Sequence, residues 1–504
     1  MQYALGLDIG SSATKVGLFT LQGTPVYIAT RCYEICEPQP GFREQDPQVW
    51  WNAAVEGIRE IVSRFDPDKI LAVGASGHIV SHVFMGQDGR PIHRSISFQD
   101  QRSVAEMEEL YDAFTRQELS AHLGIDLPPA PTWPLPRLLW LRKHSPGTLA
   151  GACCMLQAKD YINFRLTGEL ASDASSNRGV VNLSTGRPAT DVLVKLGIPD
   201  NLLPVLLKPE QIMGKVSVEA AEITGLRPGL SVATGWNDLN ASVLGSGTVR
   251  EGDAFNITGT SEHLGLVTSV MQGSPNLVCA PFLPGKFVLY GVTSCGGGSL
   301  HWYRKAFGRE YDELLAAARG APAGAASLFF LPYLDGERAP LWDPNLSGAF
   351  IGIRALHSEA HFVRAILEGV AYGLLQILEL IENTAGRRLE PLVITGGSAR
   401  VDLWSEIKAN IWGRSVSVPQ NVHSAALGAA MLAAVASNQY SNCEDASIGM
   451  LGPARKFTPD ANRSLQYREL YAHFCELYPT LRQWFAEVRG VQLRKLKEER
   501  LNDE

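Results

Sequence analysis

The stretch that decides the fold lies near the start of the chain and reads LGLDIGSSATKVGL over residues 5–18. An apolar run carries one carboxylate, Asp8, turns through Gly10-Ser11-Ser12 and returns as a second apolar run. This pattern predicts a β-hairpin with the glycine and the two serines at its bend. A buried carboxylate is costly unless it is paired or holds a cation, and small turn residues leave backbone N–H groups free for an anion. We predict either a hairpin that binds metal and phosphate or an ordinary hairpin in which Asp8 caps the turn.

A similar pattern returns in the middle of the chain, where residues 254–267 read AFNITGTSEHLGLV. Gly259-Thr260-Ser261 stands between two apolar runs, as Gly10-Ser11-Ser12 does in the first stretch. We interpret the two stretches as an internal duplication whose halves each open with a phosphate-type hairpin. The boundary is expected near residues 244–252. The predicted domains are 1–246, 247–484 and a charged C-terminal helix or tail at 485–504, in which the run from Arg494 to Arg500 is expected to be a solvated face.

Composition narrows the class of protein. The chain has 504 residues, of which 45% are hydrophobic and 19% charged, so two or three globular domains are expected. The net charge of −7 gives no electrostatic reason to bind nucleic acid or an anionic membrane. The eight cysteines show no zinc-finger spacing and are predicted to be reduced thiols. No transmembrane run or basic leader is visible, so a cytoplasmic location is expected.

Strands alternate with helices along the chain, which predicts an α/β architecture. Asp46-Pro47 starts a helix to about Phe65, and Ile70 to Ala75 forms a buried strand that ends in Ser76-Gly77-His78. In the second half, a helix is predicted from His361 to about Glu382. A strand from Leu392 to Thr395 then runs into a glycine pair.

Four glycine-rich turns fall at strand ends or at a helix start: Gly10, Gly259, Gly296 to Gly298, and Gly396-Gly397. Glycine lets the backbone come close to a ligand, and a helix N-terminus can meet phosphate. Four such turns in two duplicated halves indicate a nucleotide held from both sides of a cleft. The sequence has neither the P-loop motif nor the dinucleotide-binding glycine pattern.

Asp238 follows a predicted strand in the turn Gly235-Trp236-Asn237-Asp238. A carboxylate there could accept a proton from an attacking hydroxyl, as catalytic aspartates do in phosphoryl transfer. The alternative is that Asp238 caps the helix that follows at once.

Polar residues follow other strands of the first half. His78, Gln99, Asp100 and Arg102 suit a polyhydroxylated ligand, which needs many oriented hydrogen bonds. The alternatives are solvated loops or a surface ion pair between Asp100 and Arg102. His357 and His361 are four residues apart, and the start of a helix is favoured there over a zinc site. For Cys295, packing in a tight turn is favoured over a reactive thiol.

The chain resembles the FGGY family of carbohydrate kinases from residue 1 to about 480. The matching segments after the opening hairpin are Glu44 to Pro47 with Trp50-Trp51, Pro136 to Leu141, Lys159-Asp160-Tyr161 with Arg165 to Glu169, Leu331-Pro332-Tyr333 with Gly336 to Pro340, Gly348 to Gly352, Leu367 to Ala371, Thr395 to Arg400, and Ala425 to Ala430.

The resemblance implies two actin-like (ribonuclease-H-like) ATPase domains that flank a catalytic cleft and close over ATP and a sugar. It implies that Asp8 helps to hold Mg²⁺ and that Asp238 is the catalytic base. The residues expected to bind the nucleotide are Gly10, Ser11, Ser12, Thr14, Gly259, Thr260, Ser261, Gly297, Gly396, Gly397 and Ser398. The residues expected to bind the substrate are His78, Gln99, Asp100, Asn237 and Asp238.

Departures from the family pattern concern the sugar pocket. Family members that act on xylulose usually read SGQMHG where this chain has Ser76 to Ser81, and WNDGR where it has Phe98 to Arg102. Leu239 follows Asp238 where asparagine is usual, and Glu262 follows the second hairpin where glycine is usual.

The expected function is ATP-dependent phosphorylation of a hydroxyl of a small sugar, sugar acid or polyol, with a pentulose such as xylulose as the leading substrate. The alternatives are a kinase for gluconate or a four-carbon polyol, and an actin-like ATP-binding regulator without sugar kinase activity. Asp8 and Asp238 argue against the regulator. The expected partner is a small molecule, without nucleic acid or membrane, and a homodimer is left open.

Overall fold

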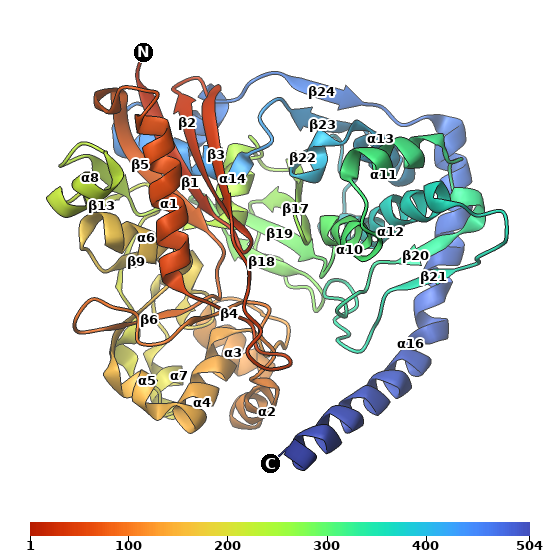
Figure 1. Ribbon diagram of the computed structural model, residues 1–504, viewed down its shortest axis with the longest axis horizontal. Helices are drawn as coiled ribbons and strands as arrows, with labels where there is room; N and C mark the ends of the chain where they lie inside the picture. Colours follow the sequence, from red (N-terminus) through yellow and green to blue (C-terminus); the bar gives the residue numbers. More distant parts are fainter. Residues whose placement is uncertain (504) are drawn as a thin grey trace.

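The computed structural model describes the backbone of residues 1–503 and the side chains of residues 1–491. Two seven-stranded sheets, one in each half of the chain, lie side by side (Figure 1). The first contains β1 (Tyr3–Ile9), β2 (Ala13–Thr20), β3 (Pro25–Cys32), β5 (Ile70–Gly77), β13 (Ile212–Lys215), β14 (Ser231–Ala233) and β15 (Trp236–Asn237). The second contains β16 (Ala254–Thr258), β17 (Glu262–Thr268), β18 (Val278–Pro281), β19 (Phe287–Val292), β22 (Leu392–Gly396), β23 (Val416–Pro419) and β24 (Ala454–Phe457).

The two sheets repeat one strand order. The first runs β13-β14-β5-β1-β2-β3, and the second runs β24-β23-β22-β16-β17-β19-β18. In each sheet the opening strand pairs antiparallel with the next strand and parallel with a later one, as β1 does with β2 and β5 and β16 does with β17 and β22. The shared order confirms the predicted duplication and the α/β, actin-like architecture. The predicted domain boundaries themselves stay predictions.

Both predicted hairpins are present. Ile9 pairs with Thr14 in the first, and Thr258 pairs with Glu262 in the second, so the bends fall at Gly10 to Ser12 and at Gly259 to Ser261. The backbone N–H of Gly10 donates to the carbonyl of Ala13 at 3.0 Å, which closes the first bend.

Helices cover the sheets, and α1 lies over the first one (Figure 1). The helices that pack around the two sheets are α1 (Pro47–Val62), α6 (Ala158–Thr167), α8 (Val218–Thr224), α9 (Asp238–Gly245), α10 (Gly297–Phe307), α11 (Tyr311–Gly320), α12 (Glu359–Ala385), α13 (Asp402–Trp412), α14 (Ser424–Ala436), α15 (Cys443–Gly449) and α16 (Ala461–Asp503). Asp46 caps α1 with Pro47 in its first turn, as predicted.

Residues 104–207 form a mainly helical insertion on the first half, drawn in orange and yellow in Figure 1. Its helices are α2 (Val104–Ala113), α3 (Arg116–Leu123), α4 (Pro134–His144), α5 (Pro146–Gly151) and α7 (Thr190–Lys195). Short strands stand outside the main sheets: β4 (Glu44–Gln45), β6 (Val83–Gly86), β7 (Ser95–Ile96), β8 (Ala152–Leu156), β9 (Ala171–Asp173), β10 (Val181–Asn182), β11 (Arg187–Pro188), β12 (Val205–Leu207), β20 (Phe329–Leu331) and β21 (Ala349–Ile351).

Helix α14 belongs to the second half in sequence but packs against β1, β5 and α9 of the first half. Glycine makes this approach possible. A Cβ atom added to Gly6 of β1 would lie 2.0 Å from the carbonyl oxygen of Ala426, and one on Gly74 of β5 would lie 2.0 Å from that of Ala429. Backbone therefore touches backbone where this helix crosses the first sheet.

The C-terminal segment is helical, one of the two forms predicted for it. Helix α16 begins at Ala461, so the expected boundary at 485 falls inside a continuous helix that contains Pro479. The hydroxyl of Tyr467 on this helix donates to Glu368 of α12 at 2.6 Å, and both side chains are buried. The solvated face predicted for Arg494 to Arg500 lies outside the described side chains.

The secondary motifs follow the simpler interpretations. Ser358 and His361 form the capping box that starts α12, as favoured over a zinc site. Cys295 is buried, which raises the pKa of its thiol to about 11, and all eight cysteines carry free thiols. Within the described residues, no helix is long and apolar enough to span a membrane, and no cluster of three or more His, Cys, Asp or Glu side chains suited to a metal ion is present.

Candidate active site

Asp238 stands at the first position of α9, directly after β15. The cap of this helix is Asn237, whose side-chain oxygen accepts the backbone N–H of Asn240 at 3.0 Å. The alternative that Asp238 caps the helix is therefore wrong. The carboxylate of Asp238 accepts the N–H of the adjacent Leu239 at 2.8 Å. Since the cap is supplied by its neighbour, this carboxylate is available for chemistry.

Asp8 lies across strand β5 from Asp238. Asp8 on β1 and Trp236 on β15 both pair with Ser76, from opposite sides of β5. Burial and the negative charge of Asp8 raise the pKa of Asp238 to about 7. Asp8 is only 8% exposed, accepts the hydroxyl of Ser76 at 3.3 Å, and lies 3.5 Å from the ammonium of Lys15. The fold thus brings the predicted metal ligand and the predicted base to one edge of the sheet.

His78 follows β5 at the same edge and is buried. Its Nδ1 lies 2.9 Å from the carbonyl oxygen of Ile9, so Nδ1 carries the hydrogen and Nε2 is left as an acceptor. Nε2 is buried and has no partner in the described chain, and burial lowers the pKa of His78, which keeps the ring neutral. A buried acceptor of this kind suits the hydroxyl hydrogen of a ligand.

Asp100 forms its predicted pair with Arg102, but the pair is buried rather than at the surface, with each side chain 1% exposed. The guanidinium of Arg102 donates to both carboxylate oxygens, at 2.8 Å each, and the backbone N–H of Arg43 donates to Oδ2 at 2.7 Å. These oxygens are already occupied, so a substrate contact by Asp100 would have to replace one of these bonds. Gln99 is exposed beside this pair.

Arg137 joins the two loops that carry these residues. It is buried, and no carboxylate among the described side chains pairs with it. Nη1 donates to the carbonyl oxygens of Val80 and Ile96, the latter at 3.2 Å. Nη2 donates to the carbonyl of Ser97 at 2.9 Å. Val80 has a φ of 62°, which is strained for a β-branched residue. The sequence showed Arg137 only as part of a helix motif, because its partners are backbone groups distant in the chain.

The second hairpin is held by the glycine turn before α10. The backbone N–H of Gly297 donates to the carbonyl of Gly259 at 2.9 Å, and those of Gly296 and Gly298 donate to the carbonyl of Thr260 at 2.7 and 3.0 Å. The N–H of Gly297 is thus hydrogen-bonded within the protein, and the role predicted for Gly297 in binding the nucleotide stays a prediction. A Cβ atom at this position would lie 2.7 Å from the carbonyl oxygen of Gly259, so glycine serves close packing here.

The Gly396-Gly397-Ser398 turn joins the same cluster. The N–H of Gly397 donates to the carbonyl of Thr258 at 3.2 Å, and that of Ser398 donates to the Thr258 hydroxyl at 3.1 Å. Three of the four glycine turns therefore gather around the second hairpin, and the fourth, at Gly10, lies in the other half. Thr14 beside it is buried, with its hydroxyl 3.1 Å from that of Tyr33.

Glu262, where glycine is usual, is balanced by a buried partner. Its Oε2 accepts from the ammonium of Lys408 at 2.6 Å and from the side chain of Asn256 at 3.0 Å. Both charged side chains are almost fully buried under the second hairpin. The departure from the family pattern is therefore matched by a second charge that is distant in the sequence.

Four further residues lie near one another where the halves meet. His263 and Tyr290 of the second half and Arg178 of the first received no role in the sequence analysis, and Arg338 appeared there only within the family segment Gly336 to Pro340. Burial and the charges of Arg338 and Arg178 lower the pKa of His263 to about 3. The guanidinium of Arg178 donates to the hydroxyl of Tyr290 at 2.7 Å, across the two halves. No local pattern marks Arg178, because it stands in the Ser- and Asn-rich loop at 171–190.

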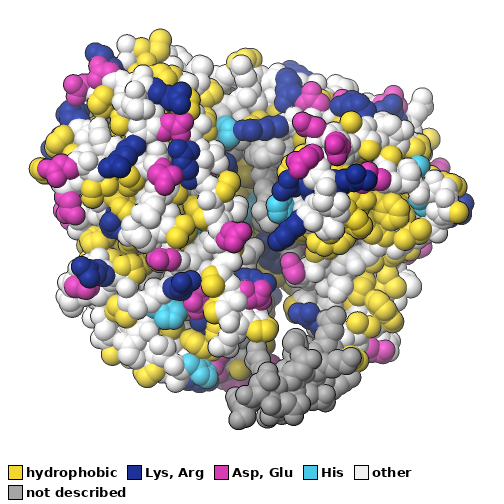
Figure 2. Space-filling model, viewed as in Figure 1, with side chains coloured by type: hydrophobic (Ala, Val, Ile, Leu, Met, Phe, Trp, Pro, Cys, Tyr) yellow, Lys and Arg dark blue, Asp and Glu magenta, His cyan; other side chains and the backbone are white. Residues whose placement is uncertain are grey.

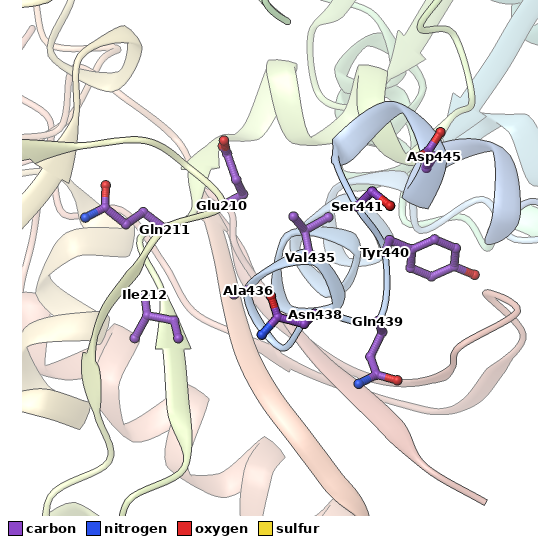
Figure 3. Close-up of a pocket in the computed structure, with 10 residues that line it drawn as sticks. All are labelled: Glu210, Gln211, Ile212, Val435, Ala436, Asn438, Gln439, Tyr440, Ser441 and Asp445. Atoms are coloured by element: carbon purple, nitrogen blue, oxygen red, sulfur yellow. The ribbon is translucent and has the colours of Figure 1, made fainter.

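Figure 2 shows Lys, Arg and His side chains gathered in the furrow between the halves. A pocket of about 520 Å³ lies between residues 25–28 on β3 and Arg400, Asn421, His423 and Arg455 of the second half. A larger pocket of about 810 Å³ lies at the other end of α14, lined by Val435, Ala436, Tyr440 and Asp445 among others (Figure 3). None of the predicted site residues lines this larger pocket.

Comparison with known proteins decides the family. The model of the FGGY carbohydrate kinase N-terminal domain matches residues 3–245, and that of the C-terminal domain matches residues 254–437. The chain belongs to the FGGY family of carbohydrate kinases. This FGGY kinase is 29% identical to the xylulose kinase of Bacillus subtilis (strain 168) over 490 residues, 95% of this chain and 97% of that protein.

Solved structures resemble this FGGY kinase throughout its length. The ligand-bound xylulose kinase of Lactobacillus acidophilus superposes with a TM-score of 0.86 at 26% identity, over 97% of this chain and 100% of that one. The gluconate kinase of the same organism superposes with a TM-score of 0.84 at 26% identity, over 95% and 98% of the chains. The family resemblance and the two-domain α/β fold expected from the sequence are confirmed. The protein is an ATP-dependent carbohydrate kinase with a small-molecule sugar substrate.

Proposed function

We propose that this kinase transfers the γ-phosphoryl group of ATP to a primary hydroxyl of a small sugar, with xylulose as the leading substrate. The observation that carries the proposal concerns Asp238. Its carboxylate does not serve as the cap of α9, and the pKa of this group is raised to about 7. The likeness to xylulose kinases of Bacillus subtilis and Lactobacillus acidophilus supports xylulose, and the likeness to a gluconate kinase keeps gluconate as the alternative. A four-carbon polyol is a further alternative.

In the proposed reaction, Asp238 accepts the proton of the substrate hydroxyl. The oxygen of that hydroxyl attacks the γ-phosphorus of ATP, and ADP leaves. His78 accepts a hydrogen bond from another hydroxyl and orients the sugar. Asp100, Gln99 and Asn237 shape the pocket around it. Each half closes over one side of the reacting groups and excludes water.

The two hairpins are proposed to hold the phosphates. The backbone N–H groups of Ser11 and Ser12 in the first hairpin, and of Thr260 and Ser261 in the second, make no hydrogen bond to other residues of the described chain. Free N–H groups at the bends suit anionic oxygens. The turn at Gly396 to Ser398 is proposed to lie by the adenosine, and the basic pocket around Arg400 and His423 adjoins it.

Asp8 is proposed to hold Mg²⁺ together with the phosphates of ATP. Carboxylate oxygens suit this hard cation, and Mg²⁺ would add to the positive charge that Lys15 places 3.5 Å from Asp8. Bound Mg²⁺ would neutralise part of the phosphate charge. A cytoplasmic location and a homodimer stay predictions.

The test is ATP consumption by the purified enzyme, coupled to ADP detection, with a panel of D-xylulose, L-xylulose, D-gluconate, erythritol and glycerol. At least one member should raise ADP formation about 100-fold above the rate without sugar. No stimulation by any of them would favour the ATP-binding regulator. In a parallel magnesium titration, Asp8→Ala should need more Mg²⁺ for half-maximal rate, and an unchanged titration would remove Asp8 from the site.

A further inference from the structure

Arg178 is a buried residue of the first half that contacts the second half, and only part of its guanidinium has hydrogen-bond partners. The residue is 2% exposed. Its Nε donates to the carbonyl of Ser175 at 3.2 Å, and Nη1 donates to the hydroxyl of Tyr290 at 2.7 Å. Nη2 is buried and has no partner in the described chain.

The guanidinium of Arg178 forms no ion pair with a described carboxylate. Its charge does act on the nearby Asp238, where it offsets part of the rise in the carboxyl pKa. A buried charge without a counter-charge is costly, so such a group is usually paired or awaits an anionic ligand.

Tyr290 adds a second donor at the same place. Its hydroxyl accepts from Arg178 and donates to no other group of the described chain, so its own hydrogen is free. A carboxylate has two oxygens and can accept from Nη2 of Arg178 and from Tyr290 together. A neutral sugar hydroxyl would leave the positive charge unpaired.

Hydrogen bonds tie this donor pair to the substrate side of the cleft. The Ser175 hydroxyl accepts from the side chain of Asn237 at 3.0 Å and from that of Trp236 at 2.7 Å. Asn237 directly precedes the proposed base, Asp238. The free Nη2 of Arg178 therefore belongs to a loop of the first half that is hydrogen-bonded to the residue before Asp238, whereas three of the four predicted nucleotide turns gather on the second half.

We propose that Arg178, with the hydroxyl of Tyr290, recognises a carboxylate on the substrate, which makes a sugar acid the preferred substrate class. The carboxylate lies at the end of the polyol chain away from the hydroxyl that Asp238 deprotonates. This proposal rests on the proposed sugar kinase activity, and it places the sugar-acid alternative above xylulose, the substrate that the likeness to relatives favours by itself. Arg178 is then a specificity-determining residue.

The test compares matched acids and alcohols: D-gluconate with D-glucitol, D-xylonate with xylitol, and D-xylulose as the neutral ketose. Wild-type kcat/KM should favour the acid of each pair by about 100-fold, as expected for a charge-assisted hydrogen bond to a buried group. Arg178→Met should lower kcat/KM for the acids about 100-fold and change that for the neutral sugars and the KM for ATP by less than about threefold. Arg178→Lys should be intermediate.

Two further variants separate recognition from folding. Tyr290→Phe removes only a hydroxyl and should lower the preference for acids about tenfold with ATP kinetics intact. Arg116→Met, at a partly exposed arginine of the same half, should leave every ratio unchanged. Calorimetric titration of the wild-type chain with gluconate and with glucitol measures the two dissociation constants without turnover, and gluconate should bind more tightly.

Several results would overturn the proposal. The first is a wild-type kcat/KM that is higher for D-xylulose or the alcohols than for the acids. The second is an equal loss of kcat/KM for acids and alcohols in Arg178→Met. The third is a raised KM for ATP in this variant, which would make a phosphate the partner of Arg178. If no sugar is phosphorylated, the proposed function fails, and the calorimetric preference for gluconate still decides the role of Arg178.

Discussion

At the scale of single residues, the candidate site depends on the different roles of Asn237 and Asp238. Asparagine and aspartate both favour the N-cap position, so the sequence alone does not determine which of the two caps the helix. Asn237 takes the cap and is fully buried, whereas Asp238 remains half-buried with an unshared oxygen. A carboxylate spared from capping and raised in pKa is suited to proton transfer near neutral pH.

Replacing the proposed base tests this role. Asp238→Asn keeps the shape of the side chain but removes the proton acceptor, so kcat should fall by about 10³-fold. The dissociation constant for ATP, measured by calorimetry, should change by less than about twofold. The exposed Asp191→Asn is the matched control and should retain the wild-type rate. A rate for Asp238→Asn near that of the wild type would refute the assignment.

The raised pKa of Asp238 predicts a pH profile. Only the carboxylate accepts a proton, and its pKa is about 7, so kcat/KM for the sugar should fall about tenfold for each pH unit below 7 and level off above it. Glu337 also has a pKa of about 7 because of burial, so the profile should be repeated with Glu337→Gln. If the acid limb is missing from the wild type, or disappears in this variant, Asp238 is not the group that titrates.

At the scale of elements, close packing of backbone on backbone decides where the glycines stand. Helix α14 crosses β1 and β5 at Gly6 and Gly74, and it meets α9 through Gly428, where a Cβ atom would lie 1.9 Å from the carbonyl oxygen of Ala241. The turn at Gly297 approaches the second hairpin in the same way. These glycines let the elements that carry the site pack closely against one another, so their role here is in packing.

A pair of substitutions tests this packing. Gly6→Ala should lower the free energy of unfolding by about 2–4 kcal/mol, because its methyl group would collide with the backbone of α14. Gly320→Ala, at the end of α11 with no atom within 4 Å of the new methyl group, should be neutral or stabilising by up to about 1 kcal/mol. Urea unfolding measures both, and equal effects would contradict the contact.

At the scale of the whole molecule, one of the three buried apolar clusters among the described residues spans both halves. Phe255, Phe282 and Tyr290 of the second half cluster with buried residues of α9 and α14. Trp236 of the first half stacks on Phe282 with ring centroids 5.1 Å apart. The halves are therefore joined by packing as well as by the chain, and the cleft is built on a common floor.

This shared core predicts that the first half does not fold alone. A fragment of residues 1–246 lacks α14, which covers β1 and β5, so it should show no cooperative unfolding and should bind a dye for exposed apolar surface. Joining residues 420–452 to it through a flexible linker should restore a cooperative transition in circular dichroism. A bare 1–246 fragment that unfolds cooperatively would show that the first sheet needs no cover from the second half.

Local sequence determined much of this protein. The strand–turn–strand patterns at residues 5–18 and 254–267 were enough to predict both hairpins and the duplication, because apolar periodicity and glycine–hydroxyl turns are properties of neighbours in the chain. The family motifs then led to the kinase function and to Asp8 and Asp238. Helix starts such as Asp46-Pro47 were readable for the same local reason.

Tertiary structure alone decided what these residues touch. It assigned the cap to Asn237 and buried the Asp100–Arg102 pair. It also used the N–H of Gly297 inside the protein, paired Glu262 with Lys408, and brought Arg178 to Tyr290. In most of these contacts the two groups are distant in the chain. In the case of Asn237 and Asp238, local rules allow either residue to cap the helix. The free energy that selects among them comes from desolvation and packing in a shared core, which no short stretch of sequence contains.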